Sequence, residues 1–402
     1  MRGFKYSGVH CGIKDNPNKL DLGIIYSEIP SQIAGSFTTN RAKAAPVILG
    51  EKRIKKGLAQ AVVVNSGNAN ACTGPLGLQN AQEMTEDAAH ALKISPELVL
   101  VSSTGKIGIP LPMEKVRNGI RQAASLLDSQ SVSQTAQAIM TTDKFIKIHA
   151  VSGSVGKIRY QIVGFGKGAG MIEPQMRPPT RGWGRHATML AYFMTDLAVG
   201  AKVLQTIFNR VVDLTFNRIT VDGDMSTNDT ALIMANGLAG NRPLSLNSPE
   251  AKAFERCLEE VALSLALKMV EDGEGATKVV QILVKGAKNE KEARKVAYAV
   301  GRSPLVKTSF FGQDPNWGRI LAAIGYSGAT FDPSRVDIYY GPVRIVASGV
   351  ATTLEDDEKA HEVMKNPTFT VTLDLKKGKG TFRIWTSDLN YDYVKLNAEY
   401  RT

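Results

Sequence analysis

The sequence predicts an α+β fold in which sheets and helices pack in separate layers. Short apolar runs of the kind that form buried strands recur along the chain, for example over residues 61–64 and 98–101. The clearest helix is expected to begin at Pro249, with Ser248 as its N-cap, and to end before Gly273. Mixed short strands with segregated helices favour layered packing over a parallel Rossmann sheet.

Apolar periodicity and composition add detail to this prediction. The helix that begins at Pro249 has apolar residues at helical spacing on one face: Phe254, Leu258, Val261, Leu265 and Met269. Further helices are expected over 112–127 and 291–300. Near Lys278 a strand-like run leads into a charged helix, which predicts a boundary before a smaller C-terminal α+β domain. A chain of 402 residues is long enough for two or three domains.

The composition is that of a globular protein, with 43% hydrophobic and 22% charged residues. The apolar-rich stretch 189–208 is interrupted by Asp196 and Lys202, so we expect no membrane span and no membrane partner. The N-terminus has no continuous apolar stretch of the secretory type. The three cysteines are far apart and odd in number, which favours a reducing compartment. Together these features predict a cytoplasmic protein.

The net charge of +11 is scattered along the chain. Two denser basic clusters, at 52–56 and 376–379, lack the interleaved aromatic residues of a single-strand nucleic-acid binder. A solvated basic surface is therefore favoured, and no nucleic-acid partner is expected.

Two loops resemble known ligand sites only in part. The glycine run 164–170 is followed by MIEPQMRPP, which cannot form the helix that a dinucleotide site needs. No Ser or Thr follows Lys167, as a P-loop would require, so we expect a glycine-rich turn that presents this lysine to an anion. Asp222 and Asp224 resemble the start of a calcium loop, but Thr227 and Ile233 stand where glycine and glutamate belong. We expect a polar turn and no metal site.

No familiar catalytic motif is present, since the sequence has no GxSxG, HExxH or CxxC. An N-terminal threonine needs no separate base, because its own α-amino group has a pKa of about 7.7–8.0. A threonine in mid-chain becomes N-terminal only through cleavage. Ala187–Thr188 is a suitable junction, because an irregular loop leads there into a strand-like apolar run, although such a step is usually only structural.

The whole chain resembles the ornithine acetyltransferase family of arginine biosynthesis. The matching segments occur in the family's order: 63–74 (VVNSGNANACTG), 102–113 (SSTGKIGIPLPM), 140–143 (MTTD), 166–176 (GKGAGMIEPQM), 187–196 (ATMLAYFMTD), 219–230 (ITVDGDMSTNDT), 271–278 (EDGEGATK), 310–320 (FFGQDPNWGRI) and 397–402 (NAEYRT). The set is far more specific than any one segment alone.

This resemblance implies a layered α/β sandwich like that of N-terminal-nucleophile enzymes, cut between Ala187 and Thr188. Residues 1–187 would form an α chain with the main sandwich and the oxyanion hole. Residues 188–278 would begin the β chain and complete the core. Residues 279–402 would form the C-terminal domain, whose tail returns to the active site.

The resemblance also implies roles for individual residues. Thr188 matches the nucleophile, and Thr104 with Gly105 matches the oxyanion hole, although a simple turn after a strand is an equally ordinary interpretation of that pair. Lys167 would pair with a substrate carboxylate and Glu274 with the side-chain ammonium of ornithine. The remaining matched substrate contacts are Thr141 (or Thr142 in an alternative alignment), Asn397 and Thr402.

The implied reaction moves the acetyl group of N-acetylornithine to glutamate through acetyl-Thr188. No cofactor is expected, although acetyl-CoA is a co-substrate of some family members, and the implied assembly is an α2β2 heterotetramer. Three alternatives stay open: a self-processed aminopeptidase or amidase of the same fold, an uncleaved inactive homologue, and a basic nucleic-acid-binding protein.

One segment departs from the family's pattern. The ten residues 177–186 (RPPTRGWGRH) stand between Met176 and Ala187, which are normally adjacent in the family. Two outcomes follow: the insert is a tolerated loop beside a self-cleaving junction, or it disturbs the junction and leaves an inert precursor.

Overall fold

The computed structural model describes residues 1–178 and 189–399, which fall into two contact units. The described part of unit 1 is 1–178, 189–217 and 224–269, and that of unit 2 is 218–223 and 270–399. No helix in these described ranges is long and apolar enough to cross a membrane.

Unit 1 is built on one sheet with the strand order β4-β3-β2-β9-β7-β6-β5, and β1 pairs with β2. The pairs β3–β4 and β7–β9 are parallel and the other pairs are antiparallel. The expected strands at 61–64 and 98–101 correspond to β3 and β4, although Leu98 itself belongs to a short 3-10 helix. The strands are β1 (Phe4–Val9), β2 (Leu22–Phe37), β3 (Leu58–Asn68), β4 (Val99–Lys106), β5 (Lys147–Val155), β6 (Ile158–Lys167), β7 (Leu190–Thr195) and β9 (Thr230–Ala235).

Strand β2 bends in its middle and folds the sheet over. Its pairing with β3 jumps from Tyr26–Ala61 to Ser31–Ala59, around the exposed segment 28–30. A straight strand from Leu22 to Phe37 would be about 50 Å long. In the structure, however, the ends of the neighbouring strands beside Leu22 and beside Phe37 lie close together at the candidate site. The two halves of the sheet therefore face one another.

The apolar side chains of unit 1 fill three spaces between four layers. One core cluster joins the facing half-sheets and contains residues such as Val62, Tyr192 and Leu232. A second lies between β2–β4 and helices α2 and α3. On the opposite side α5 contributes Phe208, whose ring lies 5.6 Å from that of Phe193 in β7. The helices are α1 (Ala45–Arg53), α2 (Gly74–Leu92), α3 (Met113–Ser125), α4 (Val132–Ala138), α5 (Ala201–Leu214) and α6 (Pro249–Glu271).

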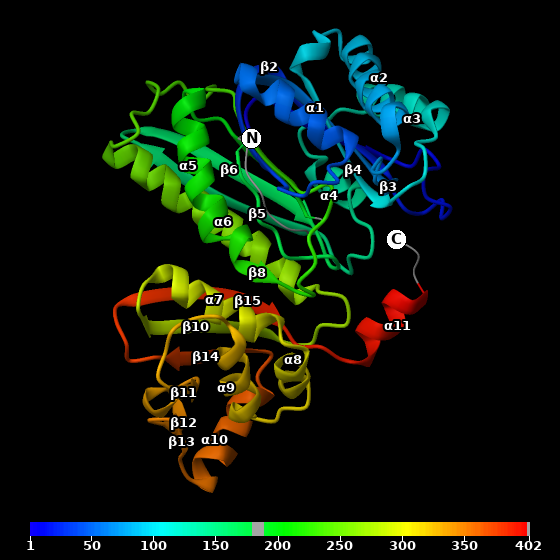
Figure 1. Ribbon diagram of the computed structural model, residues 1–402. Helices are drawn as coiled ribbons and strands as arrows, with labels where there is room; N and C mark the ends of the chain where they lie inside the picture. Colours follow the sequence, from blue (N-terminus) through cyan, green and yellow to red (C-terminus); the bar gives the residue numbers. More distant parts are fainter. Residues whose placement is uncertain (179–188, 400–402) are drawn as a thin grey trace. The chain divides into compact units, whose positions relative to one another are not determined.

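Helix α6 confirms the clearest prediction from the sequence. It begins at Pro249, the Ser248 hydroxyl accepts a hydrogen bond from the Ala251 N–H at 3.1 Å, and all five of its predicted apolar-face residues are buried. It lies close to β6, and a Cβ on Gly164 would come within 2.7 Å of Val261. Gly164 and Gly166 therefore belong to β6 and permit close helix packing, where the sequence predicted a turn, whereas Gly168 and Gly170 follow the end of the strand. Figure 1 shows α5 and α6 beside β5 and β6.

Unit 2 has a second sheet with the order β13-β12-β11-β14-β10-β15-β8. One cluster of buried side chains joins it to helices α7–α10. The predicted helix over 291–300 is α7, and the one predicted over 112–127 in unit 1 is α3. The elements are β8 (Ile219–Thr220), β10 (Val279–Ala287), α7 (Glu290–Arg302), α8 (Pro304–Phe311), α9 (Trp317–Tyr326), β11 (Asp337–Tyr340), β12 (Val343–Ala347), β13 (Val350–Ala351), α10 (Leu354–Lys365), β14 (Thr368–Asp374), β15 (Gly380–Ser387) and α11 (Tyr391–Glu399).

The packing of β7 against α5 predicts a large loss of stability for Phe193→Ala. Phe193 is 1% exposed and meets the rings of Phe208 and Phe216 edge-on. We expect the free energy of unfolding, measured by urea denaturation, to fall by about 3–5 kcal/mol. Leu126→Ala, at a site 55% exposed in the same unit, should change it by less than about 0.5 kcal/mol. Equal losses in the two variants would contradict this packing.

Candidate active site

The end of β4 holds the residues matched to an oxyanion hole. Thr104 and Gly105 belong to this strand, which continues to Lys106, so the simpler interpretation of the pair as a turn is wrong. Thr104 is 1% exposed. Gly105 has a φ of +132°, and a Cβ there would lie 2.3 Å from the carbonyl carbon of Gly67 in β3. Only glycine fits this approach of two strands, so the backbone at Gly105 is firmly placed.

Lys167 is the last residue of β6 and is 3% exposed. Its Nζ donates a hydrogen bond to Thr104 Oγ1 at 3.3 Å. Because the lysine supplies that hydrogen, the Thr104 hydroxyl keeps its own hydrogen to donate elsewhere. Two of the predicted site residues, 63 positions apart in sequence, are thus in direct contact.

A buried carboxylate that the sequence reasoning did not single out supports this lysine. Oδ1 of Asp143 accepts hydrogen bonds from the Lys147 ammonium and the Gly168 N–H, both at 2.7 Å, and Oδ2 accepts one from the Thr141 N–H at 2.9 Å. Burial alone would raise the pKa of this carboxyl, but the ammonium groups of Lys167 and Lys147 lower it to about 2. Asp143 therefore stays charged, and its carboxylate links the backbone of Thr141, a predicted substrate contact, to the two lysines.

Lys14 holds the backbone on the N-terminal side of Thr141. Its Nζ donates to the carbonyl oxygens of Leu20 and Met140, each at 2.7 Å. Burial lowers the pKa of Lys14 to about 8, although the carboxylate of Asp21 opposes that shift. The backbone on both sides of Thr141 is therefore held by charged groups, the Lys14 ammonium at Met140 and the Asp143 carboxylate at Thr141 itself.

The polar segment before β9 ties the folded sheet together. Nδ2 of Asn228 donates to the carbonyl oxygens of Ala69 at 2.6 Å and Ser103 at 2.8 Å, next to Thr104. The adjacent Asp229 is fully buried and accepts a hydrogen bond from the Met189 N–H. Burial raises the pKa of Asp229 well above its usual range, against the opposing effects of this N–H and of the Lys167 ammonium. The segment that was expected to form a polar turn thus makes buried hydrogen bonds that connect strand ends.

The chain on both sides of the predicted cleavage junction is anchored at these strand ends. Met176 exchanges two hydrogen bonds with the Asn217 side chain, and Arg177 pairs through its backbone with Phe37 at the end of β2. On the far side, Met189 is held by Asp229. The predicted residues Ala187 and Thr188, and the insert from 179 onward, lie outside the described residues.

Two further predicted residues meet in unit 2. Nδ2 of Asn397 in α11 donates to Oε2 of Glu274 at 2.9 Å. The resemblance assigns both side chains to substrate binding, and the structure places them in direct contact. Thr402, the last predicted contact, lies outside the described residues.

The comparisons with known proteins decide the family. A model of the ArgJ family matches residues 5–402. The chain belongs to the ArgJ family. It is similar to the arginine biosynthesis bifunctional protein ArgJ of Geobacter sulfurreducens, with 51% identity over 402 residues and full coverage of both chains. The ArgJ protein of Caldanaerobacter subterraneus is 48% identical over all of this chain and 97% of its own. A crystal structure of ArgJ from Bacillus halodurans is 41% identical, covers 51% of this chain and 96% of that one, and has a TM-score of 0.49.

In this ArgJ-family protein the described residues supply hydrogen-bond donors and positive charge at one edge of unit 1. Thr104 can donate a hydrogen bond, Lys147 and Lys167 act electrostatically on the Asp143 carboxylate, and Lys14 lies under the influence of the carboxylates of Asp21 and Asp143. Such a site suits an acyl substrate that carries a carboxylate.

The charge of Asp143 predicts a pH-dependent effect of Asp143→Asn. The carboxyl has a pKa of about 2 in the folded protein against an ordinary 3.8, so its stabilisation is complete above about pH 4 and is lost as the pH falls toward 2. Because the variant leaves buried ammonium groups without their carboxylate, it should be less stable than wild type by roughly 2–5 kcal/mol at pH 7.

Urea denaturation of wild type and Asp143→Asn at a series of pH values measures this difference, which should shrink below about pH 4. The exposed Asp15 provides a control, since Asp15→Asn should change stability by less than about 0.5 kcal/mol at every pH. A gap between wild type and Asp143→Asn that stays constant or widens toward low pH would show that Asp143 is not a buried charged group.

Proposed function

We propose that this protein transfers the acetyl group of N-acetylornithine to glutamate in arginine biosynthesis, with Thr188 as a nucleophile released by self-cleavage. The observation that carries the proposal is the contact between Lys167 and Thr104, on strand ends that also anchor Met189 through Asp229. This contact supports the proposal, because Lys167 pairs with Leu190 at the start of β7, where Thr104 would serve as an oxyanion donor and Lys167 as a carboxylate-binding cation. Membership of the ArgJ family supports the choice of substrates.

Maturation would use the same hydroxyl as turnover. The Thr188 hydroxyl attacks the Ala187 carbonyl carbon, the Ala187–Thr188 C–N bond breaks, and the hydroxyl proton passes to the nitrogen. Water then hydrolyses the resulting ester and releases an N-terminal threonine. An N-terminal amine with a pKa of about 7.7–8.0 is partly neutral near pH 7, so it can serve as the base for its own hydroxyl.

Turnover would proceed in two acyl transfers. The Thr188 hydroxyl attacks the acetyl carbon of N-acetylornithine, the amide bond breaks, and ornithine leaves with the proton that the amine had taken. The glutamate amine then attacks the acetyl ester and restores the hydroxyl. The Thr104 hydroxyl and the Gly105 backbone would stabilise the oxyanion in both steps, and the loss of one such donor commonly lowers the rate by about 10²–10³-fold.

Substrate selection would depend on charge. Lys167 would bind a substrate carboxylate, and Thr141, held by Asp143, would contact the substrate beside it. Glu274 would bind the ornithine ammonium, with Asn397 fixing its carboxylate. The role of Thr402, the α2β2 assembly, the use of acetyl-CoA and the cytoplasmic location stay predictions.

A self-processed aminopeptidase or amidase would hydrolyse its substrate and leave no acetyl group on glutamate. Incubation of the protein with N-acetylornithine and glutamate should therefore yield N-acetylglutamate and ornithine in equal amounts. Release of acetate at the rate of ornithine formation would instead identify a hydrolase.

Self-cleavage predicts two fragments from wild type and one from Thr188→Ala. On a denaturing gel the wild-type chain of 43.4 kDa should appear as fragments that correspond to residues 1–187 and 188–402. The variant lacks the attacking hydroxyl and should stay intact. Thr142→Ala is a matched control that should be cleaved like wild type. An intact wild-type chain would contradict self-maturation and favour the inactive homologue.

The role of Glu274 predicts a selective effect of Glu274→Gln. Loss of a charge-assisted hydrogen bond worth about 1.5–3 kcal/mol should raise KM for N-acetylornithine by roughly 10–100-fold. KM for glutamate should change much less, because glutamate has no side-chain ammonium. The exposed neighbour Glu271 provides a control, since Glu271→Gln should leave both constants near wild type. An equal rise for both substrates in Glu274→Gln would contradict the assignment.

A further inference from the structure

Helix α11 carries one of the predicted substrate contacts, Asn397, but it buries little of its own surface. None of its residues Tyr391–Glu399 is buried. The Tyr391 ring meets that of Phe311 edge-on at 6.4 Å, yet Tyr391 is 84% exposed. Apolar burial therefore contributes little to the position of this helix, since its contribution grows with the area removed from water. The hydrogen bonds at the start of α11 gain importance for where Asn397 lies.

Asn390, the residue just before α11, forms hydrogen bonds through both ends of its side-chain amide. Its Oδ1 accepts the N–H groups of Asp392 at 3.0 Å and Tyr393 at 3.4 Å, which caps the helix. Its Nδ2 donates to the carbonyl oxygen of Gly275 at 2.6 Å, across 115 positions of sequence. An aspartate would cap the helix as well, but it has no NH2 group to donate to this carbonyl. Helix capping alone therefore does not explain the asparagine.

These bonds form a circuit that returns to Glu274. The carbonyl oxygen of Tyr393 accepts a hydrogen bond from Nδ2 of Asn397 at 3.0 Å, and the same Nδ2 donates to Oε2 of Glu274 at 2.9 Å. Glu274 directly precedes Gly275, to which Asn390 is bound. The path through α11 thus begins and ends on adjacent residues, so both the backbone and the carboxylate of this short segment are tied to the helix.

The backbone at Gly275 permits this close approach. Gly275 has a φ of +74°, and a Cβ there would lie 2.6 Å from the Tyr393 nitrogen and 2.7 Å from Asn390 Oδ1. Two residues before Asn390, the Asp388 carboxylate accepts the N–H of Thr277 at 2.8 Å and its hydroxyl at 2.6 Å. Asn390 is therefore the last link between this loop and the chain before α11 begins.

We propose that Asn390 is a positioning residue for recognition of the ornithine side chain. By joining the Gly275 carbonyl to the start of α11, it holds Asn397 against Glu274 and so fixes the carboxylate that binds the substrate ammonium. Asn390 acts through Glu274 and does not itself touch the substrate. The inference rests on the proposed function, in which Glu274 binds that ammonium.

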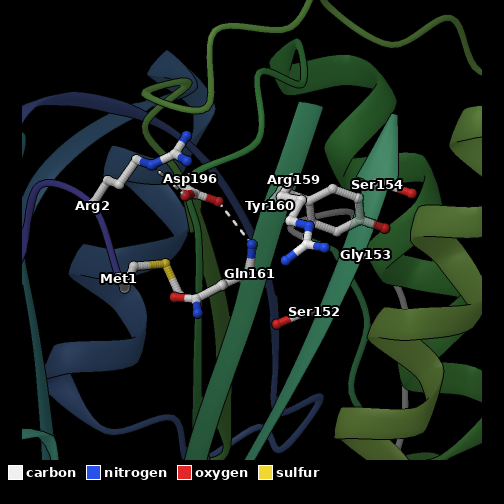
Figure 2. Close-up of a pocket in the computed structure, with 9 residues that line it drawn as sticks. All are labelled: Met1, Arg2, Ser152, Gly153, Ser154, Arg159, Tyr160, Gln161 and Asp196. Atoms are coloured by element: carbon white, nitrogen blue, oxygen red, sulfur yellow. Dashed lines mark hydrogen bonds and ion pairs between the residues drawn. The ribbon is translucent and has the colours of Figure 1, made fainter. Parts of the chain in front are cut away.

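The test compares Asn390→Asp with a matched control in unit 1. Asn390→Asp keeps Oδ1 as the helix cap and replaces the NH2 donor with an oxygen that faces the Gly275 carbonyl. Asn236 is 8% exposed, against 9% for Asn390, its Nδ2 donates to the carbonyl oxygen of Arg2 at 2.9 Å, and its Oδ1 accepts the Leu238 N–H at 3.1 Å. Figure 2 shows Arg2 in a pocket that contains none of the predicted site residues. Asn236→Asp therefore makes the same chemical change away from the site.

The measurements are kcat, KM for each substrate and the melting temperature. We expect Asn390→Asp to raise KM for N-acetylornithine by about 10-fold, the effect of losing roughly one hydrogen bond. KM for glutamate and kcat should stay near wild type, because glutamate has no side-chain ammonium, and the melting temperature should match that of Asn236→Asp. A merely structural role as a helix cap would leave KM for N-acetylornithine unchanged, because aspartate caps a helix equally well.

A double variant shows whether Asn390 acts through Glu274. In Glu274→Gln the carboxylate that Asn390 positions is gone, so the addition of Asn390→Asp should raise KM for N-acetylornithine by less than about twofold further. A further rise of about 10-fold would show that the two residues act independently, and would contradict the proposal.

The outcomes separate this inference from the proposed function. If Glu274→Gln raises KM for N-acetylornithine and Asn390→Asp does not, the positioning role is overturned while the proposed function stands. If wild type forms no N-acetylglutamate, the proposed function fails and the inference fails with it. If Asn390→Asp does not fold, Gly275→Ala, whose Cβ presses on the same contact from the other side, is measured in the same way, and a wild-type KM in that variant overturns the proposal.

Discussion

The bend of β2 is the constraint on which the site depends. A straight strand would keep the end of β4 and the start of β9 at opposite ends of β2, about 50 Å apart along the strand direction. The jump in pairing around residues 28–30 folds the sheet so that these ends meet. The Asn228 amide then binds the carbonyl oxygens of Ala69 and Ser103 directly. The apolar core between the half-sheets stabilises the fold. The candidate site lies where the strand ends of the two half-sheets meet.

The charges at this edge are stable because each has a specific partner. Burying an isolated charge is strongly unfavourable, so a buried lysine needs a carboxylate or carbonyl oxygen close by. The Asp143 carboxylate accepts a hydrogen bond from Lys147 and interacts electrostatically with Lys167. Lys14 donates hydrogen bonds to two carbonyl oxygens. The carboxylate of Asp21 also acts electrostatically on the Lys14 ammonium.

The parts of the structure that depend on local sequence could be predicted, and the parts that depend on distant contacts could not. Helix α6 follows from a Ser-Pro start and apolar residues three and four apart, both of which are local. The contact of Lys167 with Thr104 required the family resemblance to bring the two residues to attention. Asp143 and Asp229 lie in matched segments, yet their roles depend on hydrogen bonds to Gly168 and Met189 at separations of 25 and 40 residues. No periodicity records such contacts, so the supporting carboxylates were missed.

The central claim is that acetyl transfer passes through the hydroxyl of residue 188. It is tested most directly by incubating the protein with N-acetylornithine in the absence of glutamate, quenching in acid, and mapping the acetyl group by peptide mass spectrometry. The account predicts an acetyl ester on Thr188, at the N-terminus of the second fragment, that disappears when glutamate is added before the quench. An acetyl group on any other residue, or full transfer activity with no acetylated peptide, would contradict it.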